Sequence, residues 1–216
     1  MTAKLRLDFV SDIACPWCVI GLKSLEIALA RLGPEVEVDL HFQPFELNPQ
    51  MPSEGEDTAE HMARKYGSTP EQSARNREMI RSRGADVGFT FDMEKRKRVY
   101  NTFDAHRLLH WAAGRNKERD LKMALFTAYF TDGENPSDHA TLVAIAAKAG
   151  LDPVRAKQIL ESGEFAKEVR EQERFYTSNG IHAVPSVVIN NRHLIQGGQP
   201  PEVFERALRE LAKEMV

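Results

Sequence analysis

The chain has 216 residues, of which 42% are hydrophobic and 28% are charged, and its formal net charge at pH 7 is −3. This balance is typical of ordinary globular proteins and excludes the disordered and collagen-like classes. The slightly negative charge argues against a nucleic-acid partner, and no apolar run approaches the roughly 20 residues that a membrane helix needs.

The cysteine content indicates the compartment. The chain has two cysteines, separated by two residues, so no disulfide framework holds the fold together. In a reducing compartment such a pair is usually catalytic or metal-binding. Residues 1–10 also lack the basic, apolar and small-residue regions of a signal peptide. We therefore expect a cytoplasmic protein with no membrane partner.

The first elements predicted along the chain are a strand, a helix and a strand. Apolar and charged residues alternate over residues 5–10 and 36–42, as in half-buried strands. Between them, leucines at helical spacing follow Pro16, and Gly33-Pro34 ends the helix. At this spacing the three elements predict a βαβ unit with a parallel strand pair.

The middle of the chain is predicted to be helical. Residues 44–55 are rich in turn formers, whereas residues 56–178 contain almost no β-type alternation. The clearest helical stretches are 101–113, 117–131, 138–149 and 164–178, and a shorter helix starts at Asp152-Pro153. The basic run 95–98 is interpreted as a solvated helix face or helix end.

The last part of the chain returns to strands. Residues 181–190 are rich in β-branched side chains, Asn190-Asn191 suits a tight turn, and residues 193–195 form the returning strand. A terminal helix follows Pro200-Pro201.

These elements predict an α/β protein with a thioredoxin-like fold and a large all-helical insertion between its βαβ and ββα halves. We divide the chain into a discontinuous thioredoxin-like domain, residues 1–55 and 179–216, and a helical insertion domain, residues 56–178. Such an insertion is tolerable because loop-closure entropy grows slowly with length.

The dithiol Cys15-Pro16-Trp17-Cys18 carries the strongest functional signal. It lies where the first strand meets the first helix, which puts Cys15 at the helix cap. There the unpaired N–H groups and the helix dipole favour thiolate over thiol. We predict that Cys15 attacks a substrate disulfide and that the more buried Cys18 resolves the mixed disulfide, with Pro16 and Trp17 supporting the site.

The cysteine pair has two other interpretations. A zinc site would need two further ligands, and the sequence offers only His106 and His110, which share one helical face with Phe103. We predict no metal and place these histidines where the helical block meets the active site, or at a packing boundary. The second alternative is an inert pair of core thiols. It is disfavoured because burial alone would require neither the Pro16-Trp17 spacer nor a position at the start of a helix.

Val184-Pro185 is the second candidate functional segment. Proline has no backbone N–H to donate to a neighbouring strand, so it is best tolerated where a strand begins. In thioredoxin-like proteins a cis-proline faces the dithiol at this place. We expect Pro185 to be cis, so that the Val184 backbone can pair with an extended substrate segment, and keep an ordinary trans proline as the alternative.

Several segments together resemble the FrnE-like branch of the DsbA family over essentially the whole chain. They are residues 12–18, 44–49, 101–110, 184–185 and 197–200. The resemblance implies a cytoplasmic thiol–disulfide oxidoreductase, a protein disulfide reductase or isomerase, that acts on protein or small-thiol disulfides. We expect no bound cofactor beyond a redox-active disulfide, Cys15–Cys18.

Relatives in the same superfamily supply an alternative function. They include glutathione-dependent 2-hydroxychromene-2-carboxylate isomerases and kappa-class glutathione transferases, so glutathione is a possible co-substrate here. The isomerase-like relatives typically carry serine where this chain has Cys15, which favours dithiol chemistry. A non-enzymatic binding module is a third hypothesis, and both monomer and homodimer stay open. The candidate substrate-binding residues are Phe45, Asn48, Phe103, His106 and His110.

Overall fold

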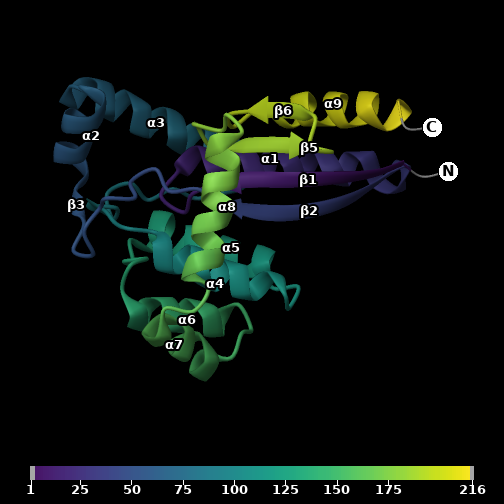
Figure 1. The fold of residues 1–216 in the computed structure, drawn as a ribbon. Coiled ribbons are helices and arrows are strands. Elements are labelled where there is room, and N and C mark those ends of the chain that lie inside the picture. The colour runs from purple at the N-terminus through teal and green to yellow at the C-terminus, as the bar shows by residue number, and fades with distance from the viewer. Residues whose placement is uncertain (1–2, 215–216) are drawn as a thin grey trace.

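A central sheet organises the computed structural model, which describes residues 3–214 (Figure 1). Its strand order is β2-β1-β5-β6. β1 (Ala3–Ser11) pairs in parallel with β2 (Val36–Pro44) and antiparallel with β5 (Ser186–Ile189). β5 pairs antiparallel with β6 (His193–Gln196). The βαβ and ββα halves therefore meet through β1, which confirms the expected thioredoxin-like fold.

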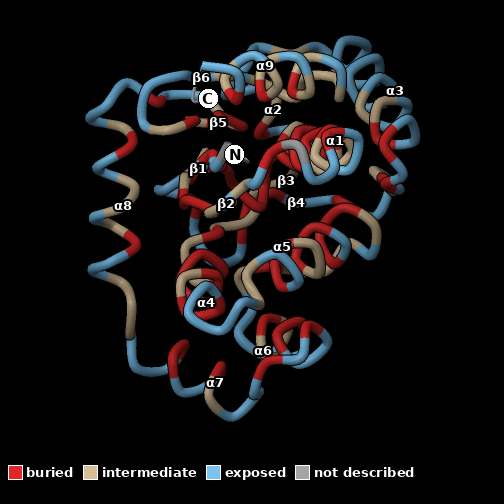
Figure 2. Tube along the Cα trace, turned by 90° about the vertical axis from the view of Figure 1, so that its right-hand side faces the viewer, coloured by how far each residue is buried: buried red, intermediate tan, exposed pale blue. Residues whose placement is uncertain are grey.

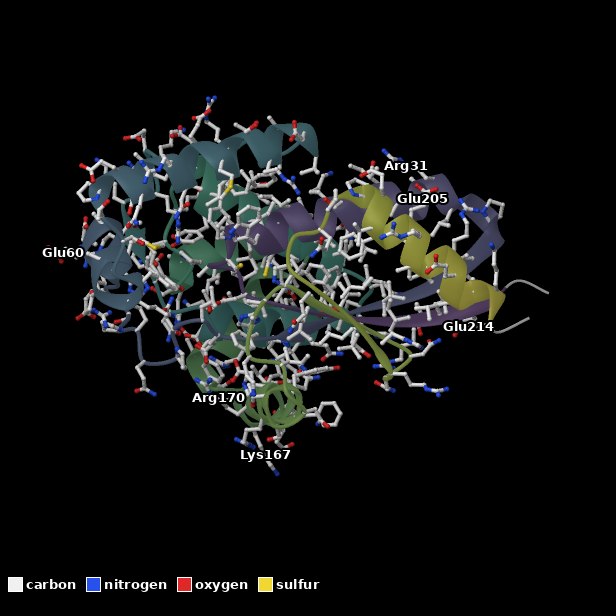
Figure 3. The ribbon with its side chains drawn as sticks, turned by 90° about the horizontal axis from the view of Figure 1, so that it is seen from above. Arg31, Glu60, Lys167, Arg170, Glu205 and Glu214 are labelled. Carbon is white, nitrogen blue, oxygen red and sulfur yellow. The ribbon has the colours of Figure 1, made fainter. Side chains whose placement is uncertain are left out.

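Helices cover both faces of this sheet (Figures 1 and 2). α1 (Pro16–Leu32) and α9 (Pro201–Lys213) pack against each other on one face, while α8 (Ala166–Ser178) crosses the other face and contacts β2. Arg31 at the end of α1 lies 3.6 Å from Glu205 of α9 (Figure 3). The alternating apolar residues of β1 are fully buried between these layers, namely Leu5, Leu7 and Phe9.

Both expected turn signals are confirmed. Gly33 follows α1 with φ 56°, a left-handed value that favours glycine and lets the chain turn back toward β2. Asn190 and Asn191 connect β5 to β6 with φ 51° and 54°, which asparagine tolerates better than most residues.

The segment between β2 and β5 is helical, as expected, with small additions. Its helices are α2 (Thr58–Tyr66), α3 (Pro70–Asp86), α4 (Phe103–Ala113), α5 (Glu118–Thr127), α6 (His139–Lys148), α7 (Pro153–Ser162) and α8. A short antiparallel ladder joins β3 (Glu56–Asp57) to β4 (Arg98–Val99), and a π-helical turn, Ala128–Asp132, continues α5. Figure 1 shows α2 and α3 gathered at one end of the sheet and α4 to α7 beneath it.

The structure of the basic run 95–98 differs from the sequence interpretation. The run forms a turn followed by β4, and no helix. Arg96 is buried, and its guanidinium carbon lies 5.0 Å from the ring centroid of Tyr129 and 5.2 Å from that of Phe130. The predicted helix was wrong here. Lys95, Lys97 and Arg98 are exposed, as predicted, whereas Arg96 is buried because these two rings accept its cation on their faces.

One apolar cluster joins the helical segment to the sheet. It contains buried side chains of β1, α1, α4 to α7 and α9, from Leu5 to Ala212. The domain division remains a prediction, and this shared core bears on how independently the two parts could fold. None of the helices within residues 3–214 is long and apolar enough to cross a membrane.

Candidate active site at the start of helix α1

The two cysteines lie in the first turn of α1. Cys15 is the cap residue, with φ −97° and ψ 111°; its amide donates to Asp12 O at 3.2 Å and its carbonyl accepts from Cys18 N at 3.1 Å. Both are free thiols; Cys15 is 4% exposed and Cys18 is fully buried. Burial, reinforced by the adjacent Cys15, raises the pKa of Cys18 well above its usual value. Cys18 therefore stays protonated unless a nearby base accepts its proton.

The Val184-Pro185 segment faces Cys15. Its peptide bond is cis, as expected, and Val184 O accepts a hydrogen bond from Cys15 Sγ at 3.6 Å. Pro185 O accepts from Gly197 N at 2.8 Å, which ties this segment to the chain after β6. A Cβ on Gly21 would stand 3.0 Å from Pro185 Cγ, so the absence of a side chain there lets α1 approach this segment closely.

Trp17 closes one side of the site. It is half-buried and lies against Gly198, where a Cβ would stand 3.1 Å from both Trp17 Cε3 and Trp17 O. The loop after β6 can therefore pass close to the dithiol because residue 198 is glycine.

Asp12 is the polar centre beneath the dithiol. Its Oδ1 accepts from Ala14 N at 3.2 Å and Thr102 Oγ1 at 2.7 Å and lies 3.4 Å from His106 Nε2; its Oδ2 accepts from Leu47 N at 2.7 Å. Burial raises the pKa of Asp12, but the hydrogen bonds from His106, Leu47 and Thr102 outweigh it and hold that pKa below its usual value. Asp12 is thus a buried carboxylate that joins β1, the loop after β2 and α4.

A buried cation lies close by. Lys122 from α5 donates to Ser11 Oγ at 2.7 Å, and its Nζ lies 5.0 Å from the ring centroid of Phe42. Burial lowers the pKa of Lys122, while the charges of Glu118, Cys18 and Asp12 act in the opposite direction. The Cys18 thiol therefore lies in the field of both a buried carboxylate and a buried ammonium group.

A pocket of about 420 Å³ opens onto Cys15. The start of α1, residues 47–48, α2, α3, Arg96 and Val184 line it, and most of the lining is apolar. Tyr66 and Met79 belong to this lining and are unusually exposed for large apolar side chains, at 55% and 46%. Arg96 Nη2 lies 3.5 Å from Ala14 O, which brings a buried positive charge next to the residue before Cys15.

The five candidate substrate-binding residues separate in space. Asn48 lines the Cys15 pocket, where its Oδ1 accepts from Lys65 Nζ at 2.7 Å, and His106 lies behind it at Asp12. The other three, Phe45, Phe103 and His110, lie outside that lining.

Their surroundings differ from one another. Phe45 packs against Val10 and Tyr176. The Arg170 guanidinium covers the Phe103 ring at 3.7 Å, and Figure 3 shows Arg170 on the side of α8 turned toward the molecule. His110 packs against Phe165 with ring centroids 5.1 Å apart and the ring planes tilted by 45°. Within residues 3–214, no three His, Cys, Asp or Glu side chains gather in a way that could hold a metal ion.

Sequence reasoning missed three buried polar residues at the site, Asp12, Arg96 and Lys122. Asp12 carries a local signal, since a carboxylate three residues before a dithiol must lie beside it when the helix starts at Pro16. Arg96 and Lys122 carry none, because their neighbours are distant in the chain. The α2 and α3 side chains over Cys15 were missed for the same reason.

Comparisons with known proteins agree with this architecture. Residues 6–209 match the model of the DSBA-like thioredoxin domain. A probable DsbA oxidoreductase from Streptomyces coelicolor superposes with a TM-score of 0.92 at 32% identity, covering 98% of this chain and 92% of that one. The Bacillus subtilis protein YwbO, described as uncharacterized, is 28% identical over 99% of this chain and 100% of its own length. The cytosolic disulfide reductase DsbM from Pseudomonas aeruginosa, solved with GSH, shares the fold with a TM-score of 0.65 at 16% identity, covering 96% and 99%. The chain belongs to the DSBA-like thioredoxin domain family.

Proposed function

We propose that this chain is a thiol–disulfide oxidoreductase of the FrnE-like branch, in which Cys15 attacks a substrate disulfide and Cys18 resolves the product. The observation that carries the proposal is the position of Cys15 at the cap of α1, beside Val184 O and at the base of the pocket. Of the two sulfurs, Cys15 is the one that lines the pocket, so it is the one an incoming disulfide can reach. Family membership and the oxidoreductase relative support it.

The reaction moves two electrons from the dithiol to the substrate. The Cys15 thiolate attacks one substrate sulfur and releases the other as a thiolate, leaving a mixed disulfide. Cys18 gives up its proton and its thiolate attacks Cys15 Sγ, which forms the Cys15–Cys18 disulfide and releases the second substrate thiolate. A thiol reductant must then restore the dithiol. Asp12, ionised and near enough for its charge to act on the Cys18 thiol, is the group we assign to accept the Cys18 proton.

The test is reduction of insulin by the wild-type chain and two single variants. We expect Cys15→Ser to abolish the reaction because the attacking sulfur is gone. We expect Cys18→Ser to accumulate the mixed disulfide, which mass spectrometry detects as an adduct on Cys15. Wild-type activity in Cys15→Ser would refute the proposal.

The size and lining of the pocket support a second candidate function. With α2 and α3 over a thiol that is 4% exposed, the largely apolar space of about 420 Å³ has the size of a small-molecule site. A glutathione-dependent isomerase or transferase for a small aromatic substrate would use such a site, with Cys15 activating glutathione. Tight glutathione binding by Cys18→Ser in calorimetry, without dithiol turnover by the wild type, would favour it.

The setting we propose is the reducing cytoplasm, with protein or small-thiol disulfides as substrates. Both cysteines of the chain are used by the proposed chemistry, so none serves as a structural staple. Whether the working form is a monomer or a homodimer is settled by light scattering.

A further inference from the structure

A second cavity lies behind the dithiol. It has a volume of about 130 Å³ and is lined by the end of β2 and by side chains of α4, α5 and α8. It shares no lining residue with the pocket that opens onto Cys15. Its rim includes exposed Ala113 and half-buried His110 and Gln172, so the cavity reaches the surface away from the substrate side.

The proposed function leaves one chemical need unmet. Cys18 is fully buried and does not line the substrate pocket, yet it must lose its proton before it can attack Cys15. Asp12 can take that proton, but Asp12 is itself 1% exposed. A proton that stopped at Asp12 would have to leave again before the next cycle.

The partners of Asp12 indicate where the proton goes. Two are backbone amides, of Ala14 and Leu47, and a third is the Thr102 hydroxyl. The fourth is the His106 imidazole, whose Nε2 lies 3.4 Å from Asp12 Oδ1. Imidazole is the side chain that exchanges protons near neutrality, and its two ring nitrogens let it take a proton on one side and release it on the other.

His106 also borders the second cavity, so it touches Asp12 and lines the space that leads to solvent. Titratable or charged groups face this region from each element packed against it. The titratable or charged groups facing this region are Asp12 after β1, His41 of β2, Glu46 after β2, His110 of α4, Glu118 and Lys122 of α5, and Arg170 and Glu173 of α8. Burial raises the pKa of Glu118 to about 7, which makes this cavity-lining carboxyl able to exchange a proton near neutrality.

We propose that His106 is a positioning residue that acts through Asp12 and carries the Cys18 proton to the cavity between β2, α4, α5 and α8. The proposal rests on the proposed function. Substrate would thus enter over Cys15 on one side, and the proton would leave on the other. No electron follows this path, since both electrons go to the substrate disulfide.

The test separates attack from resolution. The reduced chain is mixed with a low concentration of dithiobis(nitrobenzoate) in a stopped-flow instrument. Attack by Cys15 releases a first coloured thiolate at a rate that depends on reagent concentration. Resolution by Cys18 releases a second at a rate that does not. The rates of both phases are measured against pH.

The informative variant is His106→Gln. Glutamine keeps an N–H that can reach Asp12 but cannot carry a proton. We expect the first phase to be unchanged, the second phase to slow by at least about tenfold, and its pH dependence to flatten. The matched control is His139→Gln, a half-exposed histidine that lies 2.7 Å from Asp104 Oδ2 and borders neither cavity; both phases should match the wild type.

A second variant guards against a merely structural effect. Thr102→Val removes another donor to Asp12 without touching proton transfer, and should keep the pH dependence of the second phase even if its rate falls. The inference is overturned if the second phase of His106→Gln matches the wild type in rate and pH profile. It is also overturned if His106→Gln, like Thr102→Val, slows the second phase but keeps its pH dependence. A wild-type chain that releases no second thiolate refutes the proposed function itself, and the inference with it.

Discussion

At the scale of single residues, Asp12 connects segments that are far apart in the sequence. Four hydrogen-bonding partners from three separate segments converge on one buried carboxylate. Removing one partner from such a network is costly, because the other groups stay buried without a partner. Asp12 therefore positions the dithiol loop as well as holding charge beneath it.

We predict that Asp12→Asn lowers the free energy of unfolding by about 3 kcal/mol at neutral pH. The folded-state pKa of Asp12 lies below its usual value. Its contribution to stability is thus fully present above the unfolded pKa of about 3.9, and is lost as pH falls through the lower folded pKa. Urea titrations between pH 7 and pH 2 should show the wild-type advantage shrinking only below about pH 4.

The exposed Asp120→Asn serves as the control for that experiment. Asp120 lies in a surface pair with Lys117 at 3.1 Å, so its loss should change the free energy of unfolding by less than about 1 kcal/mol. A difference between wild type and Asp12→Asn that stays constant down to pH 2 would contradict the assigned carboxylate.

At the scale of elements, the start of α1 depends on close approach to the chain around Pro185. We predict that Gly21→Ala slows the reaction of Cys15 with a small disulfide by about threefold to tenfold, because its Cβ would press on Pro185 at 3.0 Å. Gly114→Ala is the matched control, since a Cβ there meets no atom nearer than 3.8 Å and the residue has φ −65°. Stopped-flow rates measure both, and equal rates would show that the contact is unimportant.

Elements with a local signal could be predicted from the sequence. Alternation identified β1 and β2, and the turn residues identified the β5–β6 hairpin, because each pattern is contained within ten residues or so. α3 begins with a capping box at Thr69 and Gln72, and this three-residue spacing is a local sequence signal for a helix start.

Contacts between distant segments could not be predicted in this way. Arg96 is surrounded by rings more than thirty positions away, and α2 and α3 reach Cys15 only through tertiary packing. The cysteines and the Val184-Pro185 segment were identified because their chemistry is visible in the residue types. The histidines were assigned together, but His106 alone lies at Asp12 because its Nε2 faces β1 while His110 faces α8.

At the scale of the whole molecule, the shared apolar cluster implies one cooperative unit despite the interrupted topology. We predict that Leu125→Ala in α5, a fully buried position, lowers the free energy of unfolding by about 2–5 kcal/mol for the entire chain. The two tryptophans make this measurable, since Trp17 reports on the sheet side and Trp111 on α4.

Fluorescence melts of Leu125→Ala in Trp17→Phe and Trp111→Phe backgrounds should give the same midpoint shift from both reporters. Val154→Ala is the control, because Val154 is 64% exposed on α7 and should shift neither midpoint appreciably. A shift confined to the Trp111 signal would show that the helical insertion unfolds on its own.

The hydrogen bond from Cys15 Sγ to Val184 O has a consequence for the order of events. Only a protonated sulfur can donate it, so the carbonyl loses this partner once Cys15 ionises and stays without it while the sulfur is covalently joined to a substrate or to Cys18. Val184 O is thus free to accept a hydrogen bond from an incoming backbone N–H during this interval. It accepts from Cys15 Sγ again when the thiol is regenerated. Whether the Cys15 sulfur carries a proton thereby sets whether this peptide group is open for docking.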